Sequence, residues 1–285
     1  MLLCRAVKQH VTVALSGDGG DEFFGGYARY NWFRKALLAQ QIPSPVRAVA
    51  AMGIKGLDRK RGGRIARWLN AKDPAELYTE ILRNWNATDQ ADLIAVDNFQ
   101  IEPVDIVRGV FDRVCADPLS QAACYDASYY IPDDLQVKLD RAAMRVALEV
   151  RCPLLDFRFA NQGIGLHTAS KYRGGLKSTL KKCLGQHLPP HVLNRPKHGF
   201  NVPLARWLAG PMRELIGETL SQQQVREAGW LNAETMDSVW DSFLAGKSQN
   251  AHSVWLLFNL SHHLTPESAD SRFTALLQTA GRQAA

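Results

Sequence analysis

Cysteine is scarce in this sequence, and its five cysteines follow no recognisable spacing. Cys4, Cys115, Cys124, Cys152 and Cys183 include no C-x-x-C pair and no Cys/His grouping typical of a zinc site. An odd number of scattered cysteines is also unlike a disulfide framework. The sequence therefore predicts reduced thiols and a cytoplasmic location.

Long hydrophobic runs are lacking too. The apolar segment Val254–Phe258 is too short to span a bilayer. Arg5, Lys8 and His10 interrupt the first residues before any long apolar stretch, so no signal peptide is expected. We therefore do not expect a membrane as a partner.

Neither sign of charge is in large excess, since the formal net charge of the 285 residues is +6. This mild basic balance suits an anionic substrate such as ATP, and it is weak evidence for nucleic acid, which is not an expected partner. The basic stretch 55–67 fits a solvated helix face or loop better than a binding patch.

Segments that predict strands are few. Val11–Leu15 is the one convincing buried strand, and most of the remaining sequence has helical periodicity. An α/β nucleotide-binding domain normally contains several strands. We therefore expect an incomplete sheet, with sequence missing upstream.

The most informative segment follows this predicted strand and reads SGDGGDEFFGGY, from Ser16 to Tyr27. Glycines allow backbone N–H groups to approach phosphate oxygens. The carboxylates of Asp18, Asp21 and Glu22 cannot bind phosphate directly, and they indicate Mg²⁺ between acid and phosphate. The alternative is an ordinary strand–loop–helix connection in which Asp21 and Glu22 complement a helix dipole.

Two further segments carry recognisable patterns. The first is YIPDDLQVKLDRAAM, residues 130–144, which continues into LEVRCPLLD, residues 148–156. Because Pro132 precedes it, a helix is predicted to begin near Asp133 or Asp134, with an extended segment over 150–152. The second is KHGFNVPLARWL, residues 197–208. Between them, a helix over about 175–186 is predicted, with Lys177 in its first turn.

These three segments, in this order, resemble motifs of the glutamine-hydrolysing asparagine synthetase family: SGDGGDE-(L/F)-F-GGY, YLPDD-x-L-x-K-x-DR-x-(S/A)M…LEVR-x-P-(F/L)LD and K-x-GF-x-x-P…W. The resemblance implies an α/β fold, the PP-loop ATP pyrophosphatase (adenine nucleotide alpha hydrolase-like) synthetase domain. It would be incomplete at its N-terminus and mostly helical here. Residues 1–265 would form the C-terminal part of that domain, and 266–285 a poorly ordered polar tail.

The resemblance also implies a carbon–nitrogen ligase that serves asparagine biosynthesis. ATP, with Mg²⁺, would adenylate the aspartate side-chain carboxylate, and ammonia from glutamine would displace AMP. The chain contains neither the family's glutaminase domain nor its SGGxDS nucleotide loop. We therefore expect these two segments as partners, no activity of this chain alone, and a possible homodimer through the open strand edge.

The resemblance assigns roles to individual residues. Asp21 matches the Mg²⁺-binding aspartate. Asp18 matches the acid that handles protons as ammonia attacks; many members carry the longer glutamate there, so a water could intervene. Ser16, Gly17, Gly19 and Gly20 match nucleotide contacts. Turn formation by Asp18 and capping by Ser16 are the alternatives.

Lys177 matches the lysine that contacts the phosphates and the charge that develops as pyrophosphate leaves. Its predicted place in a first helical turn, close to Lys181, is unfavourable unless an anion lies nearby. This hint of a nearby anion is independent of the resemblance, and the resemblance implies both a binding and a catalytic role for Lys177.

The other charged residues of the second motif have two alternative roles: they line an aspartate pocket, or they form a buried ion-pair network. The network is favoured for Glu149 and Arg151. The charged residues concerned are Asp133, Asp134, Asp140, Arg141, Glu149 and Arg151. Two alternatives for the whole chain also stay open. One is an amidotransferase acting on another carboxylate in a polysaccharide or peptide pathway, and the other is a non-catalytic remnant or binding module.

Overall fold

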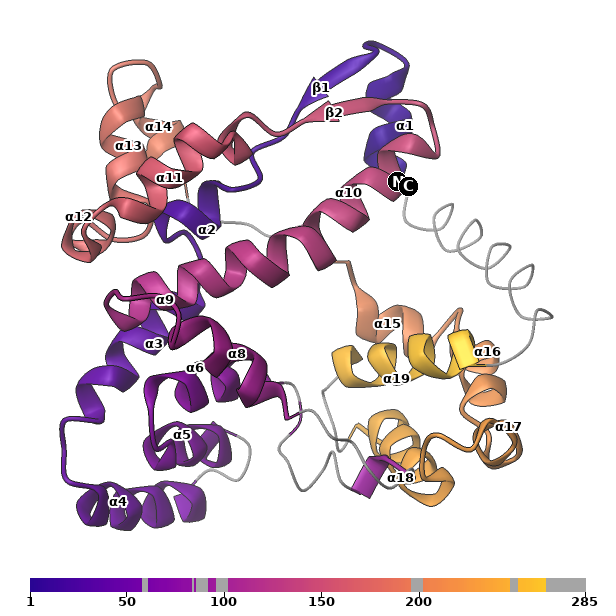
Figure 1. Cartoon of the computed structure of the whole chain (residues 1–285). Helices are drawn as coiled ribbons and strands as arrows, with labels where there is room; N and C mark the ends of the chain where they lie inside the picture. The colour runs from indigo at the N-terminus through magenta and orange to yellow at the C-terminus, as the bar shows by residue number, and fades with distance from the viewer. Residues whose placement is uncertain are drawn as a thin grey trace. The chain divides into compact units, whose positions relative to one another are not determined.

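The computed structural model describes residues 1–57, 61–83, 85, 92–95, 102–195, 202–246 and 251–264, and these residues are mostly helical (Figure 1). The chain divides into two compact units. Unit 1 comprises Met1–Leu82 and Ile101–Arg195, and unit 2 comprises Arg83–Gln100 and Pro196–Ala285. The predicted polar tail, 266–285, lies outside the described residues, as do Lys197–Asn201 of the third motif.

Unit 1 contains the two described strands and the longer series of helices. Its elements are α1 (Leu2–Lys8), β1 (Val13–Leu15), α2 (Gly20–Phe24), α3 (Ala28–Ala39), α4 (Ser44–Leu57), α5 (Arg61–Asn70), α6 (Pro74–Leu82), α8 (Pro103–Phe111), α9 (Pro118–Tyr125), the π-helix η1 (Asp126–Gln136), α10 (Val137–Met144), β2 (Glu149–Arg151), the 3₁₀-helix η2 (Pro153–Leu155), α11 (Phe157–Gly165), α12 (Thr168–Tyr172), α13 (Ser178–Leu184) and α14 (Pro190–Leu193).

Unit 2 is helical in its described part and has its own core. Its helices are α15 (Leu204–Ala209), α16 (Arg213–Thr219), α17 (Gln222–Ala228), α18 (Ala233–Leu244) and α19 (Ala251–Leu264). Met236 of α18, Ile216 of α16 and Phe258 of α19 are fully buried at its centre. Asn232 caps α18 by accepting hydrogen bonds from the backbone of Glu234 and Thr235, which explains where this helix begins.

The predicted strand exists but is shorter than expected, and it pairs with the segment predicted to be extended. β1 and β2 lie side by side and run parallel, with Ala14 opposite Val150, although they are far apart in the sequence (Figure 1). The described residues contain no further strand of this sheet. Val13 and Leu15 are exposed, so these two strands by themselves do not bury both faces of the sheet.

The helix predicted to begin near Asp133 begins much earlier, which corrects that prediction. α9, η1 and α10 follow one another without a break, and Pro132 lies inside η1 (Figure 1). Proline cannot donate the helical hydrogen bond, and its ring crowds the carbonyl four residues earlier. The wider π-helical turn accommodates this conflict without ending the helix. A rule that treats proline as a helix breaker therefore placed the boundary wrongly.

Two apolar clusters hold unit 1 together. The larger one is rich in aromatic side chains, with Tyr30 and Phe33 of α3, Leu77 and Tyr78 of α6, and Phe111 of α8. The smaller one contains Phe23 and Phe24 of α2 with Ile131 of η1, and side chains of α11 pack against it. α2 directly follows the glycine-rich loop. The second cluster therefore anchors the end of the loop through the buried side chains of α2. No helix of the described residues is both long and apolar enough to cross a membrane.

The contact between α2 and α11 is close enough to require glycine at position 163. A Cβ atom there would lie 2.8 Å from the Cβ of Phe23 and 3.1 Å from Cζ of Phe24. We expect Gly163→Ala to lower the free energy of unfolding by about 1–3 kcal/mol, because α11 would be pushed off α2. Urea denaturation measures this change.

Gly165→Ala is the matched control on the same helix, since a Cβ at Gly165 meets nothing within 4 Å. This variant is expected to change stability by less than about 1 kcal/mol, in the stabilising direction if at all. Equal destabilisation by both alanines would contradict the packing of α2 against α11.

Candidate functional site

The loop that follows β1 adopts a backbone conformation that requires glycine. The N–H of Ser16 donates to the carbonyl of Arg151 over 2.8 Å, which extends the strand pairing into the loop. Gly19 then adopts a left-handed conformation with φ of 93°, and a Cβ there would lie 2.7 Å from Cδ2 of Leu155. The N–H of Gly19 donates to Oε2 of the buried Glu22 over 3.0 Å. Backbone geometry and space together therefore fix the identity of residue 19.

The second glycine pair of the motif makes room for other side chains. Gly25 has φ of 68°, and a Cβ there would come within 2.4 Å of the Tyr172 ring. A Cβ on Gly26 would lie 1.9 Å from Oδ1 of Asp21 and 2.3 Å from Cε of Lys177. Residue 26 must therefore be glycine for the side chains of Asp21 and Lys177 to meet above it.

Asp21 and Lys177 form an ion pair, with 3.1 Å between Oδ1 and Nζ. Their side chains stay 23% and 30% exposed, so a ligand can reach both groups. Lys177 precedes α13 and has a left-handed backbone with φ of 57°, which is unfavourable for a residue with a side chain. Strain of this kind concentrates at functional sites.

The structure corrects the predicted setting of Lys177. α13 begins at Ser178, so Lys177 caps the helix and does not lie in its first turn. Gly175 and Lys177 both have positive φ values, which are incompatible with an earlier helix start. Only the helix start changes: as the N-cap, Lys177 still lies at the positive end of the helix dipole, and the anion beside it is Asp21.

Asp18 lies among a different set of side chains. Its Oδ2 accepts a hydrogen bond from Nε2 of Gln136 over 3.3 Å and lies 3.9 Å from the Sγ of Cys152. Burial raises the pKa of the Cys152 thiol, and the negative charge of Asp18 adds to this rise. Gln136 and Ser16 act in the opposite direction by hydrogen bonding to the sulfur. The structure thus brings Ser16 and Asp18 of the loop together with Gln136 and Cys152.

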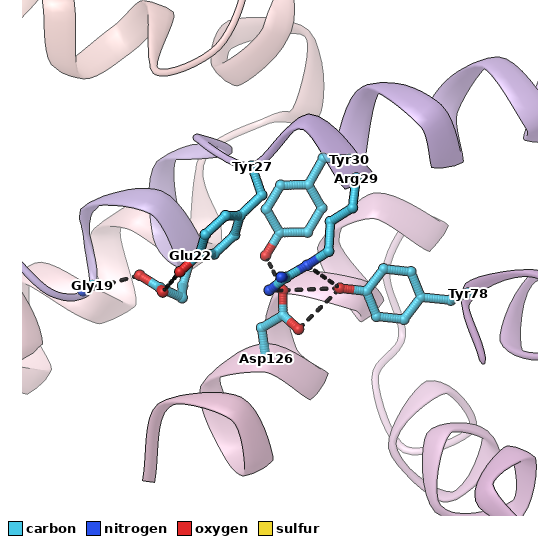
Figure 2. Close-up of polar contacts among 7 residues, drawn as sticks. All are labelled: Gly19, Glu22, Tyr27, Arg29, Tyr30, Tyr78 and Asp126. Atoms are coloured by element: carbon cyan, nitrogen blue, oxygen red, sulfur yellow. Dashed lines mark hydrogen bonds and ion pairs between the residues drawn. The ribbon is translucent and has the colours of Figure 1, made fainter. Parts of the chain in front are cut away.

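A polar network continues from the loop into the interior of unit 1 (Figure 2). Glu22 accepts a hydrogen bond from the hydroxyl of Tyr27, and the guanidinium of Arg29 lies 3.9 Å from the centre of the Tyr27 ring. Burial, the bond to Glu22 and the charge of that carboxylate raise the pKa of Tyr27. Tyr27 is therefore a neutral donor that joins Glu22 to Arg29.

Asp126, the first residue of η1, is the centre of this network and is completely buried. Its carboxylate accepts from Arg29 Nη2 and the Tyr78 hydroxyl at 2.8 and 2.9 Å, and also from Tyr30 (Figure 2). Burial and the charge of Asp126 raise the pKa values of Tyr30 and Tyr78, so both keep their protons. A buried carboxylate is tolerated only with such a set of donors.

Sequence reasoning missed most of this network. Glu22 had a local signal, because it stands three residues after Gly19, at the spacing of a capping box. Asp126 had none, since its partners Arg29 and Tyr78 lie 97 and 48 positions away in the sequence.

The charged residues proposed for a buried network in the second motif lie at the surface instead. Glu149 and Arg151 pair with each other over 2.8 Å, with side chains 56% and 65% exposed. Successive residues on one strand point to opposite faces, so positions two apart share a face, and here that face is open. Asp134 pairs with the exposed Lys138. Asp133, Asp140 and Arg141 are exposed as well.

The predicted magnesium site has one protein carboxylate. Within the described ranges, no group of three or more His, Cys, Asp or Glu side chains could hold a metal ion. Mg²⁺ requires only one or two carboxylates when phosphate oxygens complete its coordination. The partly exposed carboxylate of Asp21 fits this requirement for a metal ion that arrives with a nucleotide.

Comparison with known proteins gives one family and several relatives. Residues 1–265 match the family described as asparagine synthase. The chain is 26% identical over 276 residues to Bacillus subtilis (strain 168) "Asparagine synthetase (glutamine-hydrolyzing) 1". It is 28% identical over 271 residues to the Mycobacterium tuberculosis protein named "Putative asparagine synthetase (glutamine-hydrolyzing)". These matches cover 93% of this chain but only 42% and 41% of the relatives.

The role of Asp126 can be tested by removing its charge with little change in size. Asp126→Asn places an amide group among donors, so at least one of Arg29, Tyr30 and Tyr78 loses its acceptor. We expect the free energy of unfolding to fall by about 3–5 kcal/mol, the usual effect of breaking a buried pair. Urea denaturation followed by circular dichroism measures it.

Asp105→Asn is the matched control, because Asp105 is exposed on α8 and pairs with Arg108 at the surface. This variant is expected to unfold at the wild-type urea concentration. If Asp126→Asn behaved like Asp105→Asn, the account of the buried network would be wrong.

Proposed function

Since this chain belongs to the asparagine synthase family, we propose that it is part of a synthetase that activates the side-chain carboxylate of aspartate with ATP and then converts it into an amide with ammonia. The observation that carries the proposal is the pairing of Asp21 with Lys177 over Gly26. The ammonium group of Lys177 and the carboxylate of Asp21 are both accessible, and they meet where position 26 has room only for glycine.

The pair suits a nucleotide that carries Mg²⁺. The Nζ of Lys177 would leave Asp21 and donate to a phosphate oxygen, and Asp21 would hold the metal ion together with the phosphates. Mg²⁺ would supply positive charge that offsets the phosphates as pyrophosphate leaves. Lys177 already lies beside Asp21, so only its side chain would have to move to reach a phosphate oxygen.

Asp18 is proposed to act in the second half of the reaction. When ammonia attacks the activated carboxyl carbon, its nitrogen becomes positively charged and must lose a proton before AMP departs. The products are the amide, AMP and one proton. A carboxylate beside the loop accepts this proton, directly or through a water molecule, which is general base catalysis. Ser16, Gly17, Gly19 and Gly20 are proposed to contact the nucleotide.

The chain spans about two fifths of the length of the curated relatives that it matches. The release of ammonia from glutamine and the remaining nucleotide contacts are therefore proposed to lie in polypeptide outside these 285 residues. A cytoplasmic location and a homodimer also stay predictions.

A fusion enzyme tests the proposal. In it, this chain replaces the matching segment of the Bacillus subtilis asparagine synthetase. With ATP, Mg²⁺, aspartate and ammonium, we expect AMP and asparagine in equal amounts, with AMP formation dependent on aspartate. Asp21→Asn is expected to lower AMP formation at least 100-fold, because it weakens the hold on the metal-bound phosphates.

Asp105→Asn carries the same change of charge on the exposed surface of α8 and is expected to retain the activity of the unmodified fusion enzyme. A folded fusion enzyme that forms AMP without aspartate, or an Asp21→Asn variant as active as Asp105→Asn, would refute the proposed function.

A further inference from the structure

Three polar side chains from separate segments meet where the two strands end. Asp18 follows β1, Cys152 follows β2 directly, and Gln136 is the last residue of η1. Nε2 of Gln136 lies 3.3 Å from Oδ2 of Asp18 and 3.6 Å from Sγ of Cys152. The sulfur in turn lies 3.9 Å from the same carboxylate oxygen. All three side chains are partly buried, so they form a polar group that solvent reaches only in part.

Both contacts made by this group to Asp18 involve Oδ2. Among the described residues, Oδ1 accepts no hydrogen bond from the protein, so one oxygen is anchored and the other is available. An amide donor keeps its proton throughout the physiological range, and it stabilises the carboxylate as an acceptor. The pKa of the Cys152 thiol is raised, so the thiol also stays protonated and places no second negative charge beside Asp18.

The sequence at this group departs from the motif that it resembles. That motif has leucine at the position of Gln136, where this chain has an amide long enough to reach the loop. Asp18 is one methylene shorter than the glutamate of many members. A hydrogen bond from a neighbouring donor fixes the position of this shorter carboxylate, and Gln136 supplies that donor.

We propose that Gln136 is a positioning residue: its amide anchors Oδ2 of Asp18, so that Oδ1 is presented to the proton released by attacking ammonia, and Cys152 completes the group. This inference rests on the proposed function, because it assigns Gln136 to the amide-forming half of that reaction. In this role Gln136 acts through Asp18, with which its amide is in contact.

The existence of the group is tested in the full chain by alkylation of Cys152 with iodoacetamide at pH 8, quantified by mass spectrometry. The exposed Cys115 serves as an internal standard in every sample. Gln136→Leu removes a donor to the sulfur, and we expect Cys152 to react roughly two- to tenfold more slowly. Asp18→Asn removes a neighbouring negative charge, and we expect Cys152 to react faster by a similar factor.

Gln162→Leu, on the exposed face of α11, is the matched control and is expected to leave the Cys152 rate unchanged. Gln136→Glu keeps the length of the side chain but places a carboxylate beside Asp18, so it should slow Cys152 at least as much as Gln136→Leu. If Gln136→Leu left the rate unchanged or raised it, the group would not exist as described, and the proposal would be overturned.

The positioning role is tested in the fusion enzyme by separating the two half-reactions. Gln136→Leu is expected to lower steady-state asparagine formation about 10-fold, while the rate of aspartate-dependent pyrophosphate release in the first turnover, measured by rapid quench, changes less than about twofold. An equal loss of both rates would indicate a merely structural role and contradict the proposal. If the unmutated fusion enzyme released no pyrophosphate, the proposed function would fail by itself, and the alkylation rates would still decide whether the group exists.

Discussion

The buried ion pair between Arg29 and Asp126 is the interaction on which the rest of the candidate site depends. The fully buried carboxylate is stable only because Arg29, Tyr30 and Tyr78 all donate to it. Arg29 also packs on the ring of Tyr27, whose hydroxyl donates to Glu22, and Glu22 holds the N–H of Gly19. The shape of the glycine loop is thus determined from inside unit 1.

The π-helix η1 connects this buried network to the chemistry proposed for the loop. Asp126 is its first residue and Gln136 its last, so one element contacts the network at one end and Asp18 at the other. π-helical turns are uncommon and occur often at functional sites. Here the wide turn accommodates Pro132 and keeps a continuous helix between the two contacts.

The sequence was informative where the signal is local. The apolar, β-branched run Val11–Leu15 precedes a glycine-rich segment, and both a strand, over Val13–Leu15, and the loop after it are present. The starts of two helices were predicted wrongly, because rules for α-helix boundaries describe neither the π-helix that contains Pro132 nor the left-handed cap at Lys177. Asp126 and the Gln136–Asp18 contact depend on residues close only in the fold, so no local pattern could reveal them.

The central claim is that the loop after β1, together with Lys177, receives a phosphate-bearing ligand. The most direct measurement is a titration of the isotopically labelled chain with Mg²⁺ and inorganic pyrophosphate, followed by the chemical shifts of backbone amides. The account predicts that the largest changes occur over Ser16–Gly26 and at Lys177, and that the helices of unit 2 show no comparable change. Changes centred on unit 2, with the loop unaffected at saturating ligand, would contradict it.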